Sequence, residues 1–225
     1  MNNIKDFMDT VGKELSEANS YAQMKRIMDK SGLEYLGSGS ARIVYKLDED
    51  SVVKVAKNQF GLHQNATETD FYIQQEFEDF LTKTKDFDDE NYRFTIAEYA
   101  TKIKSQKELF TKINDIYGVS GDDFSSFIEN LDKVMRFNSS PSYKKLDEIN
   151  EKYPDNELLN NIQRICQETD ILPGDFDRHS SWGMVREDGR EKLAIKDYGL
   201  SLENYKMFVL KKDSSPQPRR GPYMM

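Results

Sequence analysis

The sequence predicts an α+β fold, in which short antiparallel strands and amphipathic helices occupy separate stretches of the chain. Residues 33–57 are rich in Val, Ile and Tyr, and they contain the alternating run 42–47, the acidic turn 48–50 and the apolar run 51–56. This pattern predicts an antiparallel β meander with a glycine-containing turn. The longer segments 105–137 and 143–169 are predicted to be helical. Strands that follow one another locally, with the helices grouped elsewhere, are typical of α+β proteins rather than of alternating βαβ proteins.

The remaining elements follow in chain order. Residues 3–30 carry apolar residues at steps of three and four, which predicts an amphipathic helix or a helix pair that ends at Gly32. Residues 64–85 are predicted to form a helix, and residues 92–97 a short strand. A break at 138–141 separates the long helices, a hairpin is expected over 182–195, and a last helix over 201–212. Residues 213–225 hold three of the six prolines and are expected to form a flexible tail.

Composition limits the classes of function. The chain has 225 residues and a formal net charge of −8, which disfavours binding to a nucleic-acid backbone or to an anionic membrane. The single cysteine, Cys166, excludes an intramolecular disulfide, and His63 and His179 are too far apart in sequence to indicate a zinc site. Since the chain has no apolar run long enough to span a bilayer, we expect a soluble, cytoplasmic protein.

Three features of the β meander and the following helix are candidates for chemistry. Gly37 and Gly39 flank a strand–strand turn and would let the backbone approach a phosphate, although an ordinary hairpin turn explains them equally well. Lys54, on the next strand, should point opposite to Val53 and Val55; a solvent-facing strand lysine is the alternative, and Lys57 is a rival. Glu68 is placed to pair with Lys54, or else lies on a solvated helix face.

Two acidic elements lie on either side of the predicted hairpin. The first is Pro173-Gly-Asp-Phe-Asp177, followed by Arg178, and the second is Asp197-Tyr-Gly199, which follows a short apolar strand. Carboxylates in these positions would supply oxygen ligands to magnesium and an acceptor for a hydroxyl proton. A simple turn aspartate is the alternative for Asp197.

Taken together, the ordered set Gly37-x-Gly39, Val44, Lys54, Glu68, Asp175 and Asp197-Tyr-Gly199 resembles the protein-kinase signature. The resemblance covers about residues 33–200 and is closest to small, divergent kinase-like proteins of bacteriophages and some bacteria. It implies a minimal bilobal kinase-like fold with four parts. These are a helical extension (1–31), a nucleotide-binding β lobe with one helix (32–100), a reduced helical lobe carrying the catalytic and metal-binding loops (101–212) and the tail (213–225).

The resemblance also implies roles for individual residues. ATP would be bound by the turn at Gly37, Ser38 and Gly39, by Val44, by Lys54 braced by Glu68, and by the segment of Glu98 and Tyr99 at the hinge between the lobes. Asp175 would be the catalytic acid–base residue, with Arg178 steadying the transferred phosphoryl group. Magnesium would be held by Asp197 and Ser180.

Several departures from the kinase pattern leave two functions open. Arg42 stands where the third glycine of the loop belongs, and Ser180 stands where the second metal ligand is normally an asparagine, with Asp177 as a substitute. Only 26 residues follow Gly199, which leaves little room for a peptide-docking lobe. The first hypothesis is an ATP- and Mg-dependent phosphotransferase acting on a protein or small-molecule hydroxyl, including Ser214, Ser215 or Tyr223 of its own tail. The second is a pseudokinase that binds a partner without phosphoryl transfer.

Overall fold

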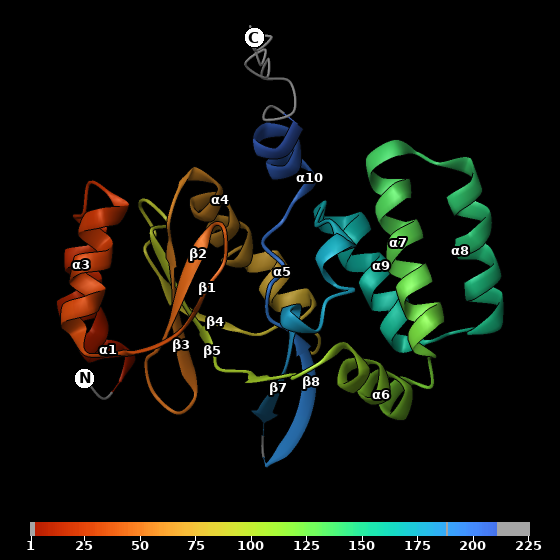
Figure 1. Ribbon diagram of the computed structural model, residues 1–225, viewed down its shortest axis with the longest axis horizontal. Helices are drawn as coiled ribbons and strands as arrows, with labels where there is room; N and C mark the ends of the chain where they lie inside the picture. Colours follow the sequence, from red (N-terminus) through yellow and green to blue (C-terminus); the bar gives the residue numbers. More distant parts are fainter. Residues whose placement is uncertain (1–2, 188, 211–225) are drawn as a thin grey trace, which may run out of the picture.

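Five antiparallel strands form the main sheet. They are β1 (Glu34–Ser38), β2 (Arg42–Lys46), β3 (Ser51–Ala56), β4 (Thr84–Phe87) and β5 (Phe94–Glu98), in the spatial order β1-β2-β3-β5-β4. The computed structural model describes residues 3–187 and 189–210 (Figure 1). The sheet and a separate helical region together confirm the predicted α+β fold class. The edge strand β4 was not predicted, because Thr84, Lys85 and Asp86 interrupt any run of β-branched or aromatic residues.

The N-terminal helices cover one face of this sheet. Of the two alternatives for residues 3–30, a single helix or a helix pair, the structure has the pair. The first helical segment is built from α1 (Ile4–Phe7), a π-turn (Met8–Gly12) and α2 (Lys13–Ser16), and the second is α3 (Tyr21–Ser31). Gly32 ends α3 with a φ of 73°, a left-handed conformation that favours glycine. Buried apolar residues from the helices, such as Phe7 and Met28, pack on sheet residues such as Val53 and Val55. The N-terminal extension therefore shares a core with the sheet.

Two short helices, α4 (Gln59–Glu68) and α5 (Phe71–Glu76), replace the single helix predicted over 64–85. The interruption has a local cause, since Asp70 caps α5 by accepting a hydrogen bond from the amide of Ile73. Helix α4 packs against β3 on the side of the sheet away from the N-terminal helices (Figure 1). As a result all six residues of β3 are buried, although a strand covered on only one face would alternate in exposure.

The helical region consists of α6 (Gln106–Tyr117), α7 (Gly121–Phe137), α8 (Ser140–Lys152) and α9 (Glu157–Thr169). Each of the two long predicted segments is thus divided. Ser120 and Asn156 cap the second helix of each pair with their side chains. The predicted break at 138–141 is shorter than expected, because Pro141 fits in the first turn of α8. Phe124, Phe127 and the other inward residues of these helices form the larger of the hydrophobic cores.

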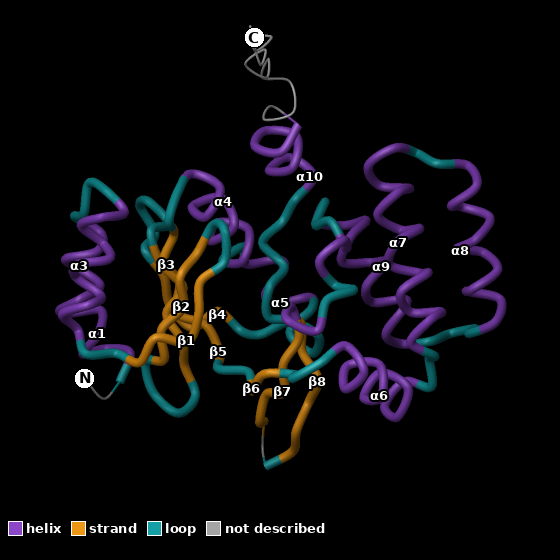
Figure 2. The backbone as a smooth tube through the Cα atoms, in the orientation of Figure 1, coloured by secondary structure: helices purple, strands orange, loops and turns teal. Residues whose placement is uncertain are grey.

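A second, three-stranded sheet joins the two regions (Figure 2). It contains β6 (Thr101–Lys102) and the predicted hairpin of β7 (Trp182–Glu187) and β8 (Arg190–Ile195). The chain then continues into α10 (Leu202–Asn204) and a π-helical turn (Tyr205–Leu210). No helix in the described ranges 3–187 and 189–210 is long and apolar enough to cross a membrane. The predicted tail, with Ser214, Ser215 and Tyr223, lies outside the described residues.

Candidate functional site

Strand β3 positions Lys54. Successive side chains of a strand point to opposite faces, and Val53 and Val55 face the N-terminal helices, so Lys54 faces the other way, as predicted. It lies opposite Val44 on β2 and Thr95 on β5. The lysine is only 6% exposed. A buried ammonium needs compensating partners, and the neighbouring helix supplies one.

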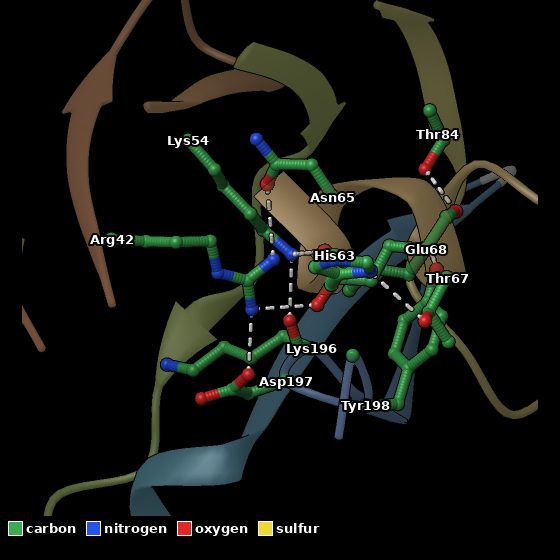
Figure 3. A network of polar contacts seen from close by, with 12 residues as sticks. Arg42, Lys54, His63, Asn65, Thr67, Glu68, Thr84, Lys196, Asp197 and Tyr198 are labelled. Atoms are coloured by element: carbon green, nitrogen blue, oxygen red, sulfur yellow. Dashed lines mark hydrogen bonds and ion pairs between the residues drawn. The ribbon is translucent and has the colours of Figure 1, made fainter. Parts of the chain in front are cut away.

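Glu68 is the last residue of α4, and it forms the ion pair with Lys54 that was expected from the sequence. The Lys54 Nζ donates to Glu68 Oε2 at 2.6 Å and to the backbone oxygen of Lys196 at 2.8 Å (Figure 3). The carboxylate of Glu68 is buried. Burial lowers the pKa of Lys54, against the opposing effect of Glu68. Lys57, the rival lysine, instead donates to the backbone oxygen of Gly39 at 2.7 Å and so closes the glycine turn.

Arg42 links the Lys54–Glu68 pair to Asp197. Its Nη2 donates both to Glu68 Oε1 and to Asp197 Oδ1, each at 2.7 Å, and its Nη1 lies 3.4 Å from Asn65 Oδ1 (Figure 3). Burial alone would raise the pKa of Glu68, but the two cations outweigh it and hold that pKa at about 2. Burial likewise opposes the charge of Arg42, but its two carboxylate partners raise its pKa. The cluster is therefore two cations paired with two carboxylates.

The alternation of side chains along residues 42–47 is a local signal for the position of Arg42, although the resemblance to kinases marks this residue only as a departure from the third glycine. Strand β2 places Arg42 and Val44 on the same face, since side chains alternate, and Val44 pairs with Lys54. An arginine two residues before Val44 thus belongs to the same face as the predicted lysine.

The opposite wall carries Asp175 and Arg178. Asp175 ends a 3₁₀ turn (Pro173–Asp175), and Arg178 Nη1 lies 3.0 Å from its Oδ1. Burial raises the pKa of Asp175, and the nearby charge of Asp197 adds to this effect. The indole Nε1 of the buried Trp182 donates to the backbone oxygen of Phe176 at 2.7 Å. This contact fixes the loop from behind.

The suggestion that Asp177 replaces the missing metal ligand is not supported by its contacts. Its Oδ1 accepts a hydrogen bond of 2.6 Å from Ser125 on α7, and its backbone oxygen accepts one from Gln106 on α6. The residue therefore anchors the loop to the helical region. Ser180, in the turn His179–Ser181, is exposed and lines the cleft.

The glycine turn and the segment after β5 form the rim of the cleft. Gly37 and Gly39 line it, whereas the hydroxyl of Ser38 is directed to the backbone of its own turn. A Cβ on Gly37 would meet no heavy atom within 4 Å, which leaves open space above the turn. Glu98 and Tyr99 also line the cleft. Their amides donate to the backbone oxygens of Lys83 and Asp50, at 2.8 and 2.9 Å.

Gly199 is required by a close approach of two segments. Its φ is not in the left-handed region, but a Cβ there would lie 2.7 Å from the backbone oxygen and the Cβ of Gln64 on α4. The preceding residue, Tyr198, is buried and donates to the backbone oxygen of Thr82 at 3.0 Å. These contacts fix the backbone on the C-terminal side of Asp197 against α4.

Arg42, Lys54, Asp175, Arg178 and Asp197 line one cleft of about 740 Å³ between the main sheet and the helical region, and Glu68 holds Lys54 and Arg42 without lining it. Among the described residues that line it, six are basic and three are acidic. The basic ones are Arg42, Lys54, Lys102, Arg136, Arg178 and Lys196. The acidic ones are Glu98, Asp175 and Asp197. A protein of net charge −8 thus concentrates positive charge in its cleft, which suits an anionic ligand.

The donor set around Asp197 does not fit a magnesium ion held by the protein. Mg²⁺ takes near-octahedral oxygen ligands, usually one or two carboxylates with waters and phosphates. Here Asp197 Oδ1 is paired with Arg42, Asp177 faces Ser125, and Ser180 offers a single hydroxyl. Within residues 3–187 and 189–210, no group of three or more His, Cys, Asp or Glu side chains is placed to hold a metal ion.

Comparison with known proteins finds only distant structural likeness. No family model and no curated protein matches the chain. Solved structures of APH(2")-IIa, in a streptomycin–ATP ternary complex and in a gentamicin complex, are 16% and 18% identical, with TM-scores of 0.33 and 0.35. Each alignment covers 81% of this chain and 71% of that one. SAICAR-synthase from Saccharomyces cerevisiae, complexed with SAICAR, is 10% identical with a TM-score of 0.34, over 74% and 73% of the two chains. At this level of likeness, only the chain's own residues carry a functional argument.

Proposed function

We propose that this protein binds a nucleoside triphosphate such as ATP in the cleft and transfers its terminal phosphoryl group to a hydroxyl acceptor. One observation carries the proposal: Lys54, Asp175 and Asp197 come from three separate elements and line a single cleft, and Glu68, from a fourth element, is paired with Lys54. Positioning and electrostatic stabilisation account for most of phosphoryl-transfer catalysis, so such a convergence suits that chemistry.

The lining of the cleft supports separate places for the phosphates and the base. Lys54, held by Glu68, and Arg42 present positive charge beneath the open glycine turn, where the phosphates would lie. Val44 and Val52 offer an apolar surface to the base. Because the amides of Glu98 and Tyr99 already donate to backbone oxygens, we assign recognition of the base to the next residue along, Ala100, which also lines the cleft.

Asp175 is the proposed general base. Its raised pKa brings it closer to neutrality, which suits a group that accepts a hydroxyl proton during transfer. The Arg178 guanidinium, paired with it and with a side chain 70% exposed, is free to contact the transferred group from the solvent side. The acceptor would be a protein or small-molecule hydroxyl that enters beside these two residues.

A second candidate is a nucleotide-binding module without transfer. The Arg42–Asp197 ion pair favours it, because the carboxylate that holds magnesium in kinases is here bound to a guanidinium. Ser180 stands in place of the asparagine of the kinase pattern, and this substitution also favours the second candidate.

Incubation with γ-labelled ATP separates the two candidates. We expect label on the protein or on an added hydroxyl compound, reduced at least about 100-fold in Asp175→Asn, since general bases typically contribute 10²–10⁴-fold. Arg164→Gln, on the exposed face of α9, is the matched surface control and should keep full transfer. Binding of ATP without transfer in the wild type would establish the second candidate. Absence of binding would contradict both.

A further inference from the structure

We infer that Arg42 takes, at Asp197, the place of a divalent cation, so that the cleft binds the phosphates of a nucleotide without a metal ion. The inference rests on the proposed nucleotide site and concerns how that site balances charge. Its basis is the position of one guanidinium between the buried Lys54–Glu68 pair and the carboxylate at the mouth of the cleft (Figure 3).

The position of Arg42 is fixed by several contacts. The side chain is 8% exposed, and it is held by Glu68, whose side chain is 1% exposed, and by the fully buried Asn65. Asn65 is itself anchored, because its Nδ2 donates to the backbone oxygen of Tyr92 at 2.7 Å. Moving the guanidinium away would leave Glu68 with a single cationic partner in a buried site, which is costly. Arg42 is thus a built part of the cleft floor rather than a mobile surface arginine.

Charge favours the same conclusion. A metal ion between Asp197 and a triphosphate would bridge two anions. Arg42 already neutralises Asp197 and itself lines the cleft, so a guanidinium stands beside this carboxylate where the metal ion would otherwise lie. A guanidinium is a good ligand for phosphate, since its planar donors match phosphate oxygens. A metal ion beside Asp197 Oδ1 would be repelled by the positive charge of Arg42, which lies 2.7 Å from that oxygen.

Titration calorimetry of the full chain with ATP, in EDTA and in Mg²⁺, tests the inference. We expect the wild-type Kd in EDTA to lie within about threefold of that in Mg²⁺. Arg42→Gln should bind at least about tenfold more weakly in EDTA, while Arg164→Gln, an exposed arginine on α9, should bind like the wild type. Wild-type binding that requires Mg²⁺ would overturn the inference and leave the nucleotide site intact. Absence of wild-type binding under both conditions would overturn the nucleotide site and the inference together.

Asp197→Asn provides an independent variant, because its side chain is 49% exposed and lies outside the buried pair. If Arg42 supplies the cation, removing this carboxylate frees the guanidinium for phosphate, and binding in EDTA should stay equal or become tighter. If Asp197 instead holds a metal ion, the variant should lose at least about tenfold of its affinity in Mg²⁺, which would contradict the inference.

Discussion

The guanidinium of Arg42 lies 2.7 Å from the carboxylate of Asp197, although 155 residues separate them in the sequence. The same Nη2 atom also lies 2.7 Å from Glu68. The first strand after the glycine turn, the helix α4 and the loop after β8 therefore meet at one side chain. This meeting point organises the charges of the cleft.

Glu68→Gln should lower the free energy of unfolding by about 3 kcal/mol, because it leaves Arg42 and Lys54 buried with one negative partner fewer. Urea unfolding followed by circular dichroism measures the change. The matched control is Glu168→Gln, whose side chain is 35% exposed and pairs on the surface with Arg164. This control substitution should lower the free energy of unfolding by less than about 1 kcal/mol. Equal costs for the two variants would contradict the importance assigned to the buried cluster.

Stability should fall as the pH is lowered from about 5 toward 2, and Glu68 should account for part of this fall. Its pKa is about 2 in the folded protein and 4.5 in the reference state, so the unfolded chain binds a proton first. The stabilisation is present above the unfolded pKa and is lost as pH falls through the folded one. The difference corresponds to about 3 kcal/mol.

Unfolding of the wild type and of Glu68→Gln across this range checks the pH prediction. Asp123 and Glu187 also have pKa values of about 2, but both are present in the two proteins, so the difference between the wild type and the variant reports on Glu68. The wild type should lose more stability on acidification than the variant. Parallel curves for the two proteins would count against the assignment to Glu68.

Gly199→Ala should destabilise the protein by about 1–3 kcal/mol, because the added Cβ would lie 2.7 Å from the backbone of Gln64. Gly37→Ala is the matched control, since its Cβ would meet no heavy atom within 4 Å. That change should stay within about 0.5 kcal/mol. Thermal melts of both variants make the comparison. A tolerated alanine at 199 would show that α4 and the Asp197 loop do not pack as closely as described.

The features predicted correctly depend on local patterns. Alternation in residues 51–56 is enough to place Lys54 opposite to Val53 and Val55, and the order of elements is enough to suggest its pairing with Glu68. The hairpin at 182–195 likewise follows from two apolar runs around one turn.

The predictions fail where distant contacts or single capping residues determine the bounds of an element or the partner of a side chain. The division between α4 and α5 depends on the cap at Asp70. Phe77, Phe80 and Leu81 lie within the helix predicted over 64–85, but they pack in the core beyond the end of α5. The contact of Asp177 with Ser125 joins residues far apart in the chain, so no local pattern could show it. The position of Arg42 in the charge cluster is hidden for a different reason, because the resemblance to kinases assigns this position to glycine.

The proposed nucleotide site depends on the cations fixed around Glu68. Titration of ATP into the wild type and into Lys54→Met tests this dependence, because Lys54 lines the cleft and its ammonium is held by Glu68 at 2.6 Å. We expect saturable binding to the wild type and at least about tenfold weaker binding to the variant, provided that the variant keeps its circular dichroism spectrum. Equal affinity of two folded proteins, or no binding to the wild type, would contradict it.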